Sequence, residues 1–210
     1  AIPYILRFKP DFVFVESPPL ALAFSGLILA KLCRAKFILN VSDLWPLTAK
    51  ELGAISEGAL YRGLERLERY FYKRAFLCTG QSQEIVDYIS GHGGKRVLLF
   101  RNGVDYKRFE RALFKINRPK MRLVYAGLLG VAQGIAAICR NVNFGDLNVE
   151  FHIYGAGAER KEIEQFLSKN RGCGIYLHAA VNRDEVPHIL GSYDGALIPL
   201  ARRIYGAVPS

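Results

Sequence analysis

The chain has 210 residues, half of them hydrophobic, which is enough to build one large core or two small ones. The longest apolar run, Leu20–Cys33, contains Lys31 and falls short of the about 20 apolar residues that cross a bilayer. The first residues lack the basic region and cleavage site of a signal peptide. We therefore expect a soluble, cytoplasmic protein and exclude a membrane-spanning one.

The cysteines and histidines argue against a metal or disulfide framework. Four cysteines stand far apart without a CxxC pair: Cys33, Cys78, Cys139 and Cys173. This spacing is typical of buried thiols in a reducing compartment. None of the four histidines has a His, Cys or carboxylate neighbour at ligand spacing. We predict no metal site and no cofactor.

Positive charge is concentrated in the first part of the sequence. The formal net charge is +10, and 19 Lys and Arg face 11 Asp and Glu up to Arg118. A basic segment indicates an anionic partner, which could be nucleic acid, a phosphate compound or a membrane surface. Charge alone leaves these three open.

Short apolar runs alternate with helical patterns through the first half. Strands are predicted at residues 11–16, 36–41, 76–79 and 97–100. Helices are predicted at residues 20–33, 60–74 and 84–90. Strands that alternate with helices favour a parallel sheet with helical crossovers.

The same alternation restarts after the turn-rich segment between Asn102 and Pro119. Strands are predicted at 122–126, 149–154, 175–178 and 195–198, with helices starting near Gly134, Ala158 and Arg183. The predicted fold class is therefore α/β, with one parallel-sheet domain at 1–105, a linker at 106–118 and a second domain at 119–210. Both domains look incomplete, the first at its beginning and the second at its end, as in an internal fragment.

Glycine-rich loops follow two strands of the second domain, AGLLGVAQG at 126–134 and YGAGAE at 154–159. Gly127, Gly134, Gly155 and Gly157 would let backbone amides approach a phosphate at the carboxyl ends of parallel strands. The alternative is that these glycines only make tight turns, and a single GxG pattern does not decide between the two.

Two further segments carry polar candidates. Asn182 precedes Glu185 by three residues, the spacing of a capping box, and Arg183 beside it could still contact a nucleotide base. The loop NVSDLWP at 40–46 follows a strand and holds Asp43 and Trp45, which suit a sugar because a carboxylate accepts hydroxyl protons and an indole stacks on C–H faces. The alternative places Asp43 as a helix cap and Trp45 in the core.

These motifs, in this order, resemble the retaining GT-B glycosyltransferases of family 4. The resemblance rests on SDLWP, RNGVD, AGLLGVAQG, FHIYGAGAER, VNRDEVPHIL, YDGALIPL and VPS, which span most of the chain. The DLWP motif is similar to the one in the branch of this family that builds capsule, O-antigen and other surface polysaccharides. The GT-B fold has two Rossmann-like domains.

The resemblance implies a role for each candidate. The second domain would bind a nucleotide-sugar, with UDP expected, and the first a glycan or lipid-linked acceptor, with Asp43 as catalytic residue beside Trp45. Helix dipoles and cations would neutralise the diphosphate without a metal. The loop has Val131 to Gln133 where many relatives place a cation, so Arg202 or Arg203 could supply that charge. The family's paired glutamates would follow Ser210.

Other functions are weighed against this one. A nucleotide-sugar epimerase would share the GT-B fold, and a non-catalytic nucleic-acid-binding module would explain the net charge, but no nucleic-acid-reading motif is present. Five basic residues fall on the predicted helix 60–74: Arg62, Arg66, Arg69, Lys73 and Arg74. They predict peripheral contact with an anionic membrane at its inner face, or simply a solvated helix face.

Overall fold

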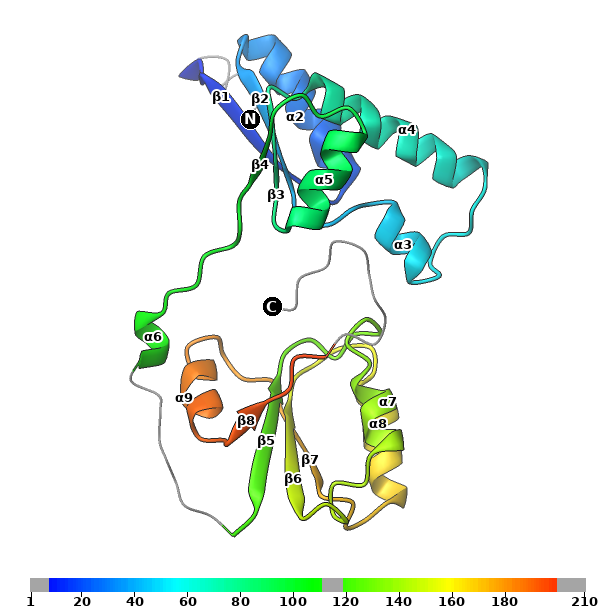
Figure 1. The fold of residues 1–210 in the computed structure, drawn as a ribbon, viewed down its shortest axis with the longest axis vertical. Helices are drawn as coiled ribbons and strands as arrows, with labels where there is room; N and C mark the ends of the chain where they lie inside the picture. Colours follow the sequence, from blue (N-terminus) through cyan, green and yellow to red (C-terminus); the bar gives the residue numbers. More distant parts are fainter. Residues whose placement is uncertain (1–7, 111–118, 200–210) are drawn as a thin grey trace. The chain divides into compact units, whose positions relative to one another are not determined.

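The protein consists of two α/β units, each with a parallel sheet, and a computed structural model describes residues 8–110 and 119–199. The units divide between Gly103 and Val104 (Figure 1). Each unit contains a sheet of four strands, and every pairing is parallel. The predicted α/β fold class with parallel sheets is thereby confirmed.

The first sheet has the order β1-β2-β3-β4. Its strands are β1 (Phe12–Ser17), β2 (Lys36–Val41), β3 (Leu77–Gly80) and β4 (Val97–Leu99). The connecting helices are α2 (Leu20–Cys33), α3 (Leu47–Glu51), α4 (Ala59–Arg74) and α5 (Gln83–Gly91). No described helix is long and apolar enough to cross a membrane.

The three longer helices of this unit lie on the same face of the sheet. Val15, Leu39 and Cys78 are paired across β1, β2 and β3, and all three pack in the core with side chains of α2, α4 and α5. Strand side chains alternate between faces, so Phe12, Phe14 and Leu98 project from the opposite face. Their side chains are 51%, 58% and 54% exposed on that face. Figure 1 shows α2, α4 and α5 together on the other side of the sheet.

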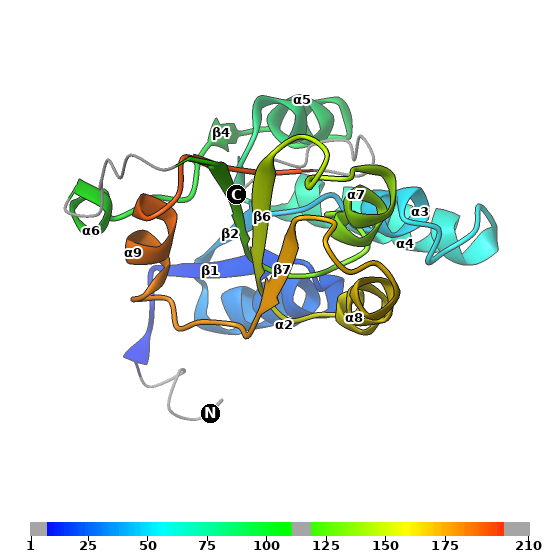
Figure 2. The same ribbon diagram turned by 90° about the horizontal axis from the view of Figure 1, so that it is seen from below.

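The second sheet has the order β7-β6-β5-β8. Its strands are β5 (Met121–Ala126), β6 (Val149–Tyr154), β7 (Ile175–His178) and β8 (Gly195–Ala196). The helices are α6 (Lys107–Glu110), α7 (Ile135–Asn141), α8 (Arg160–Lys169) and α9 (Val186–Gly191). Figure 2 shows α7 and α8 on one side of this sheet and α9 on the other, and Phe151 and Ile153 are buried among core residues of α7 and α8.

Predicted element bounds agree with the structure for several mainly apolar segments. Residues 20–33, 36–41, 149–154 and 175–178 form the predicted elements with the same bounds. The short helices α3 and α6 were not predicted. α6 lies within the predicted linker 106–118, of which residues 111–118 are outside the described part. Arg108 of α6 contacts Asp184 at 3.0 Å, which attaches this segment to the loop before α9.

The cysteines are all free thiols. Cys78 and Cys139 are buried, as predicted, and burial raises the pKa of each thiol to about 12. Cys33 and Cys173 are only partly buried. The two buried thiols therefore stay protonated and unreactive near neutral pH.

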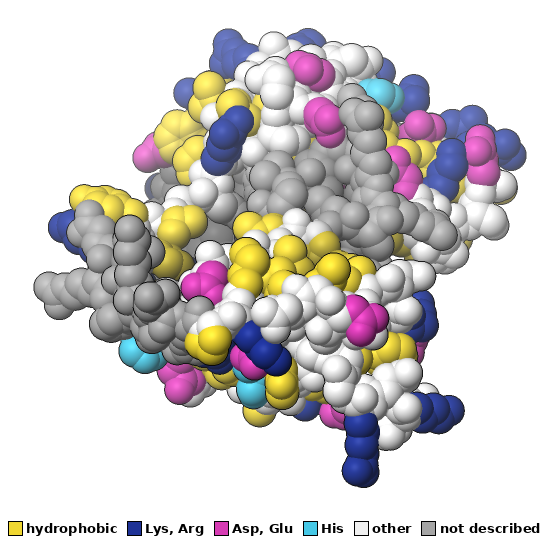
Figure 3. Space-filling model, turned by 60° about the horizontal axis from the view of Figure 1, so that its bottom comes forward, with side chains coloured by type: hydrophobic (Ala, Val, Ile, Leu, Met, Phe, Trp, Pro, Cys, Tyr) yellow, Lys and Arg dark blue, Asp and Glu magenta, His cyan; other side chains and the backbone are white. Residues whose placement is uncertain are grey.

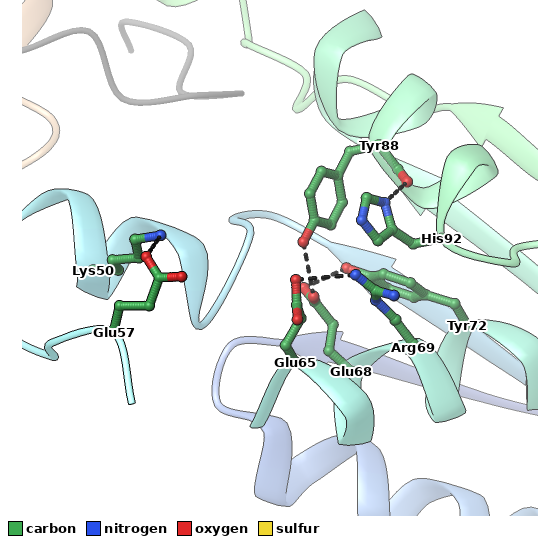
Figure 4. A network of polar contacts seen from close by, with 8 residues as sticks. All are labelled: Lys50, Glu57, Glu65, Glu68, Arg69, Tyr72, Tyr88 and His92. Carbon is green, nitrogen blue, oxygen red and sulfur yellow. Dashed lines mark hydrogen bonds and ion pairs between the residues drawn. The ribbon is translucent and has the colours of Figure 1, made fainter. Parts of the chain in front are cut away.

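A buried carboxyl group joins α4 to α5 (Figure 4). Glu68 is 2% exposed and accepts a hydrogen bond from the hydroxyl of Tyr72 at 2.6 Å and a longer one from Tyr88 at 3.4 Å. Burial raises the pKa of Glu68 to about 7, although both hydroxyls favour its ionised form. His92 stacks on Tyr88 with ring centroids 3.8 Å apart.

We predict that Glu68→Gln stabilises the first unit at pH 8 and changes little at pH 5. The folded-state pKa lies above the ordinary value of 4.5, so the folded state binds the extra proton, and stability falls as pH rises from about 4.5 to 7. The neutral amide avoids this loss of about 3 kcal/mol. Urea unfolding at both pH values measures the difference. An equal effect at the two values would contradict the prediction.

Candidate functional site

The strand order of the second sheet marks a place for a ligand. The chain runs outward from β5 to β6 and β7, and then returns to add β8 on the other side of β5. The strand order therefore reverses between β5 and β8. Open α/β sheets bind ligands in the crevice at such a switch point. The predicted glycine loop 126–134 is the segment that leaves β5.

That loop is held against the loop that follows β6. Gly127 donates a backbone hydrogen bond to Tyr154 at 3.0 Å, and Leu129 donates one to Ala156 at 2.9 Å. A Cβ on Gly155 would collide with the carbonyl oxygen of Gly127. A Cβ on Gly157, which has φ of +151°, would collide with that of Leu129. Gly155 and Gly157 thus have a demonstrable packing role between the two loops.

Gly134 has a left-handed conformation with φ of 63° and precedes the first turn of α7. The amide of Ala136 in that turn donates to the Glu159 carboxylate at 3.0 Å. A carboxylate at a helix N-terminus is stabilised by the helix dipole, as a phosphate would be. This amide is therefore already used by the chain itself, and sequence reasoning did not foresee the contact.

A cation was also missed at this edge of the sheet. The Arg160 guanidinium donates to the carbonyl oxygens of Gly155 at 2.6 Å and His178 at 2.9 Å, and pairs with Glu164 at 2.9 Å. It thereby places positive charge at the carboxyl ends of β6 and β7. Arg202 and Arg203, the cations named from sequence, lie outside the described residues.

Asn182 and Arg183 lie in the turn that leads to α9. The carboxylate of Glu185 accepts from the Asn182 amide at 2.9 Å, which is one half of the predicted capping box. The helix begins at Val186 and not at Arg183, because residues 183–185 form a turn. Arg183 is exposed, so its contact with a base stays a prediction.

Aromatic rings line the sheet face opposite α7 and α8. His152 Nδ1 lies 2.9 Å from His178 Nε2, and His178 stacks on Tyr154 at 4.3 Å. Tyr193 bonds to Tyr154 at 2.9 Å. Burial and the Arg122 guanidinium lower the pKa of both histidines. The pair is therefore neutral at pH 7 and can share one ring proton.

In the first unit, polar side chains gather at the carboxyl ends of β1, β2 and β3. Asn40 accepts a hydrogen bond from Thr79 at 2.7 Å, and the Ser42 hydroxyl donates a hydrogen bond to the Glu16 carboxylate. Asp43 follows in the loop after β2, where its carboxylate accepts from the Thr48 hydroxyl at 2.5 Å.

The structure bears on both interpretations of this loop. The N-cap of α3 is Pro46, and within residues 8–110 and 119–199 Asp43 accepts from the Thr48 side chain and from no backbone amide of the helix. Trp45 is partly buried and packs against the core. Asp43 is half-buried and accepts one hydrogen bond, from Thr48, so its carboxylate retains lone pairs for a ligand. The catalytic role of Asp43 stays a prediction.

We predict that Gly155→Ala lowers the free energy of unfolding of the second unit by about 1–3 kcal/mol, because the added methyl group must separate two bonded loops. Gly63→Ala is the control. Gly63 lies within α4 and a Cβ there meets no atom within 4 Å, so alanine is expected to stabilise by about 0.5–1 kcal/mol. Equal stability of Gly155→Ala and the unaltered chain in urea unfolding would show that the loops separate freely.

The architecture defines an α/β protein of the GT-B class, and comparisons agree. Residues 2–103 match the family described as glycosyl transferase 4-like domain, and this match covers nearly all of the first unit. No curated protein matches the sequence.

Solved structures extend the likeness to both units. Sucrose-phosphate synthase from Thermosynechococcus elongatus has a TM-score of 0.75 at 14% identity, covering 97% of this chain and 54% of its own. Anabaena HepE in complex with UDP gives 0.66 at 12%, covering 93% and 55%. The catalytic domain of Arabidopsis thaliana starch synthase IV, bound to ADP and acarbose, gives 0.64 at 14%, covering 95% and 54%. This chain therefore spans little more than half of each, and the likeness shows the fold.

Proposed function

We propose that the protein containing this chain is a glycosyltransferase that moves a sugar from a nucleotide diphosphate donor, UDP-linked, to a lipid-linked or growing glycan acceptor with retention at the anomeric carbon. The observation that carries the proposal is the switch point beside β5, where the glycine loop opens. The family match of residues 2–103 supports the reaction class, and HepE bound to UDP supports the donor class.

The two units divide the work in this proposal. The loops after β5 and β6 receive the donor diphosphate through backbone amides near Gly127 and Gly157, while the Gly127 amide itself stays bonded to the carbonyl oxygen of Tyr154. Arg160 contributes positive potential at the same edge, while its guanidinium group remains hydrogen-bonded to the carbonyl oxygens of Gly155 and His178. The loop after β2 receives the acceptor, with Asp43 as hydrogen-bond acceptor and Trp45 as an apolar wall.

Asp43 provides the first test. In the intact protein, Asp43→Asn is expected to lower turnover by roughly 10²–10⁴-fold, the range of a positioned acid or base. Asp87→Asn is the matched control, because Asp87 is an exposed carboxylate of α5 that accepts a hydrogen bond from Gln83, and the substitution removes the same charge. Normal turnover by Asp43→Asn would remove this residue from the site.

The 210-residue chain provides the second test. We expect it to bind UDP weakly and to transfer no sugar, because it spans only 54% of sucrose-phosphate synthase and 55% of HepE, the solved structures that it resembles. Misplacement of either partner forfeits much of the rate gained by proximity. Isothermal titration with UDP and a transfer assay on one preparation measure both. Efficient turnover by this chain alone would contradict the proposed mechanism.

A further inference from the structure

The first sheet carries an unusual charge distribution at the amino ends of its strands. Parallel pairing brings these ends to one edge, opposite to the edge that holds Asp43. Basic residues occur at or just before the start of every strand: Lys9 for β1, Arg34 and Lys36 for β2, Lys73 and Arg74 for β3, and Lys95 and Arg96 for β4. Asp11 is the one carboxylate in the same positions. The second sheet has no such series before β6, β7 or β8.

A hollow of about 380 Å³ opens at this edge. Its apolar wall includes Leu27, Phe37 and Phe76. Four cationic side chains also line it: Lys31, Arg34, Lys36 and Arg74. We name it the cationic hollow. Figure 3 shows Lys and Arg side chains in dark blue along the top of the view, where the first unit lies.

Cation–π contacts are made by Lys36, which lines the hollow, and by Arg96, which shares the Phe76 ring with it. Lys36 Nζ lies 4.6 Å from the centroid of the Phe76 ring, and the guanidinium carbon of Arg96 lies 4.7 Å from the same centroid. Lys36 also lies 5.5 Å from the ring of Phe12. These cation–π contacts gather like charges around one ring and reduce the freedom of flexible side chains.

Helix dipoles account for only part of this arrangement. Lys31 lies in the last turn of α2, and Arg74 in the last turn of α4, where cations are favoured. Lys36 and Arg96 lie at strand starts, where that explanation fails. Among the residues that the structure describes, neither the four cations that line the hollow nor Arg96 forms an ion pair with a carboxylate. Neighbouring like charges without a counter-ion repel one another, and an anion would relieve that repulsion.

We propose that the cationic hollow binds a phosphate group, as a phosphomonoester with an apolar body. Arginine forks and lysine ammonium groups recognise phosphate oxygens, and several cations suit a dianion better than a carboxylate. The apolar wall accommodates the part of the molecule next to the phosphate. The site is separate from the proposed donor site and does not depend on the proposed function. The phosphate can come from a lipid headgroup or from a soluble compound.

The first experiment titrates the full chain with inorganic phosphate and follows backbone amides by NMR. Saturable shifts are expected at Ala35, Phe37 and Phe76, beside the hollow. The double variant Lys36→Gln with Arg74→Gln should raise the Kd roughly tenfold or more, because each basic contact lowers the Kd by about fivefold. Both side chains are exposed, so an unchanged thermal midpoint checks that the variant is folded.

The matched control is Arg62→Gln with Arg66→Gln, which removes the same charge from exposed positions of α4 outside the hollow. Less than a twofold change is expected. Equal weakening in the two double variants would overturn the proposal in favour of a diffuse electrostatic attraction.

Vesicle flotation separates the two sources of phosphate. Phosphatidylcholine vesicles containing phosphatidic acid present a phosphomonoester, and those containing phosphatidylglycerol present a phosphodiester. Stronger retention on phosphatidic acid, lost in Lys36→Gln with Arg74→Gln, assigns the site to a lipid headgroup. Binding of inorganic phosphate without such retention assigns it to a soluble phosphomonoester. Absence of saturable binding to both inorganic phosphate and phosphatidic acid vesicles would overturn the proposal.

Discussion

Parallel strand pairing is the constraint on which the rest of the structure depends. Because each strand must return to the same edge before the next begins, a helix or long loop follows every strand, and all carboxyl ends of a sheet meet. In the first unit this gathers Glu16, Asn40 and Asp43 at one edge and the cationic hollow at the other. In the second it places the glycine loops together beside β8.

Much of the fold could be predicted from the sequence because buried parallel strands are short, continuous apolar runs. β2 and β7 contain such runs, whereas β6 alternates polar and apolar residues over part of its length, and all three were located without error. α3 was missed because its five residues after Pro46 are too few for a helical period of apolar residues to be recognised. α9 begins at Val186, later than the predicted start near Arg183, because the Glu185 carboxylate bonds to the Asn182 amide and residues 183–185 form a turn.

The candidate site was less predictable, because its contacts join residues from separate loops. The pattern GAGAE indicates glycines that face a phosphate, and the structure shows that Gly155 first serves the packing of one loop on another. Glu159 and Arg160 follow in sequence, yet their partners lie on α7 and β7. The basic residues before each strand of the first sheet were visible, but only the pairing of those strands gathers them at one edge.

The bonded pair of loops after β5 and β6 has a consequence for motion. Their backbones are joined at Gly127 and at Leu129, and no side chain separates them at Gly155. Two segments tied in this way fluctuate together, so ordering one of them also orders the other. A ligand that contacts only the loop after β5 would order both loops, and its binding free energy would include the entropic cost of ordering them. A second group that binds to the loop after β6 would then meet a segment that is already ordered. Cooperativity between two parts of one ligand can thus arise here without a change of shape.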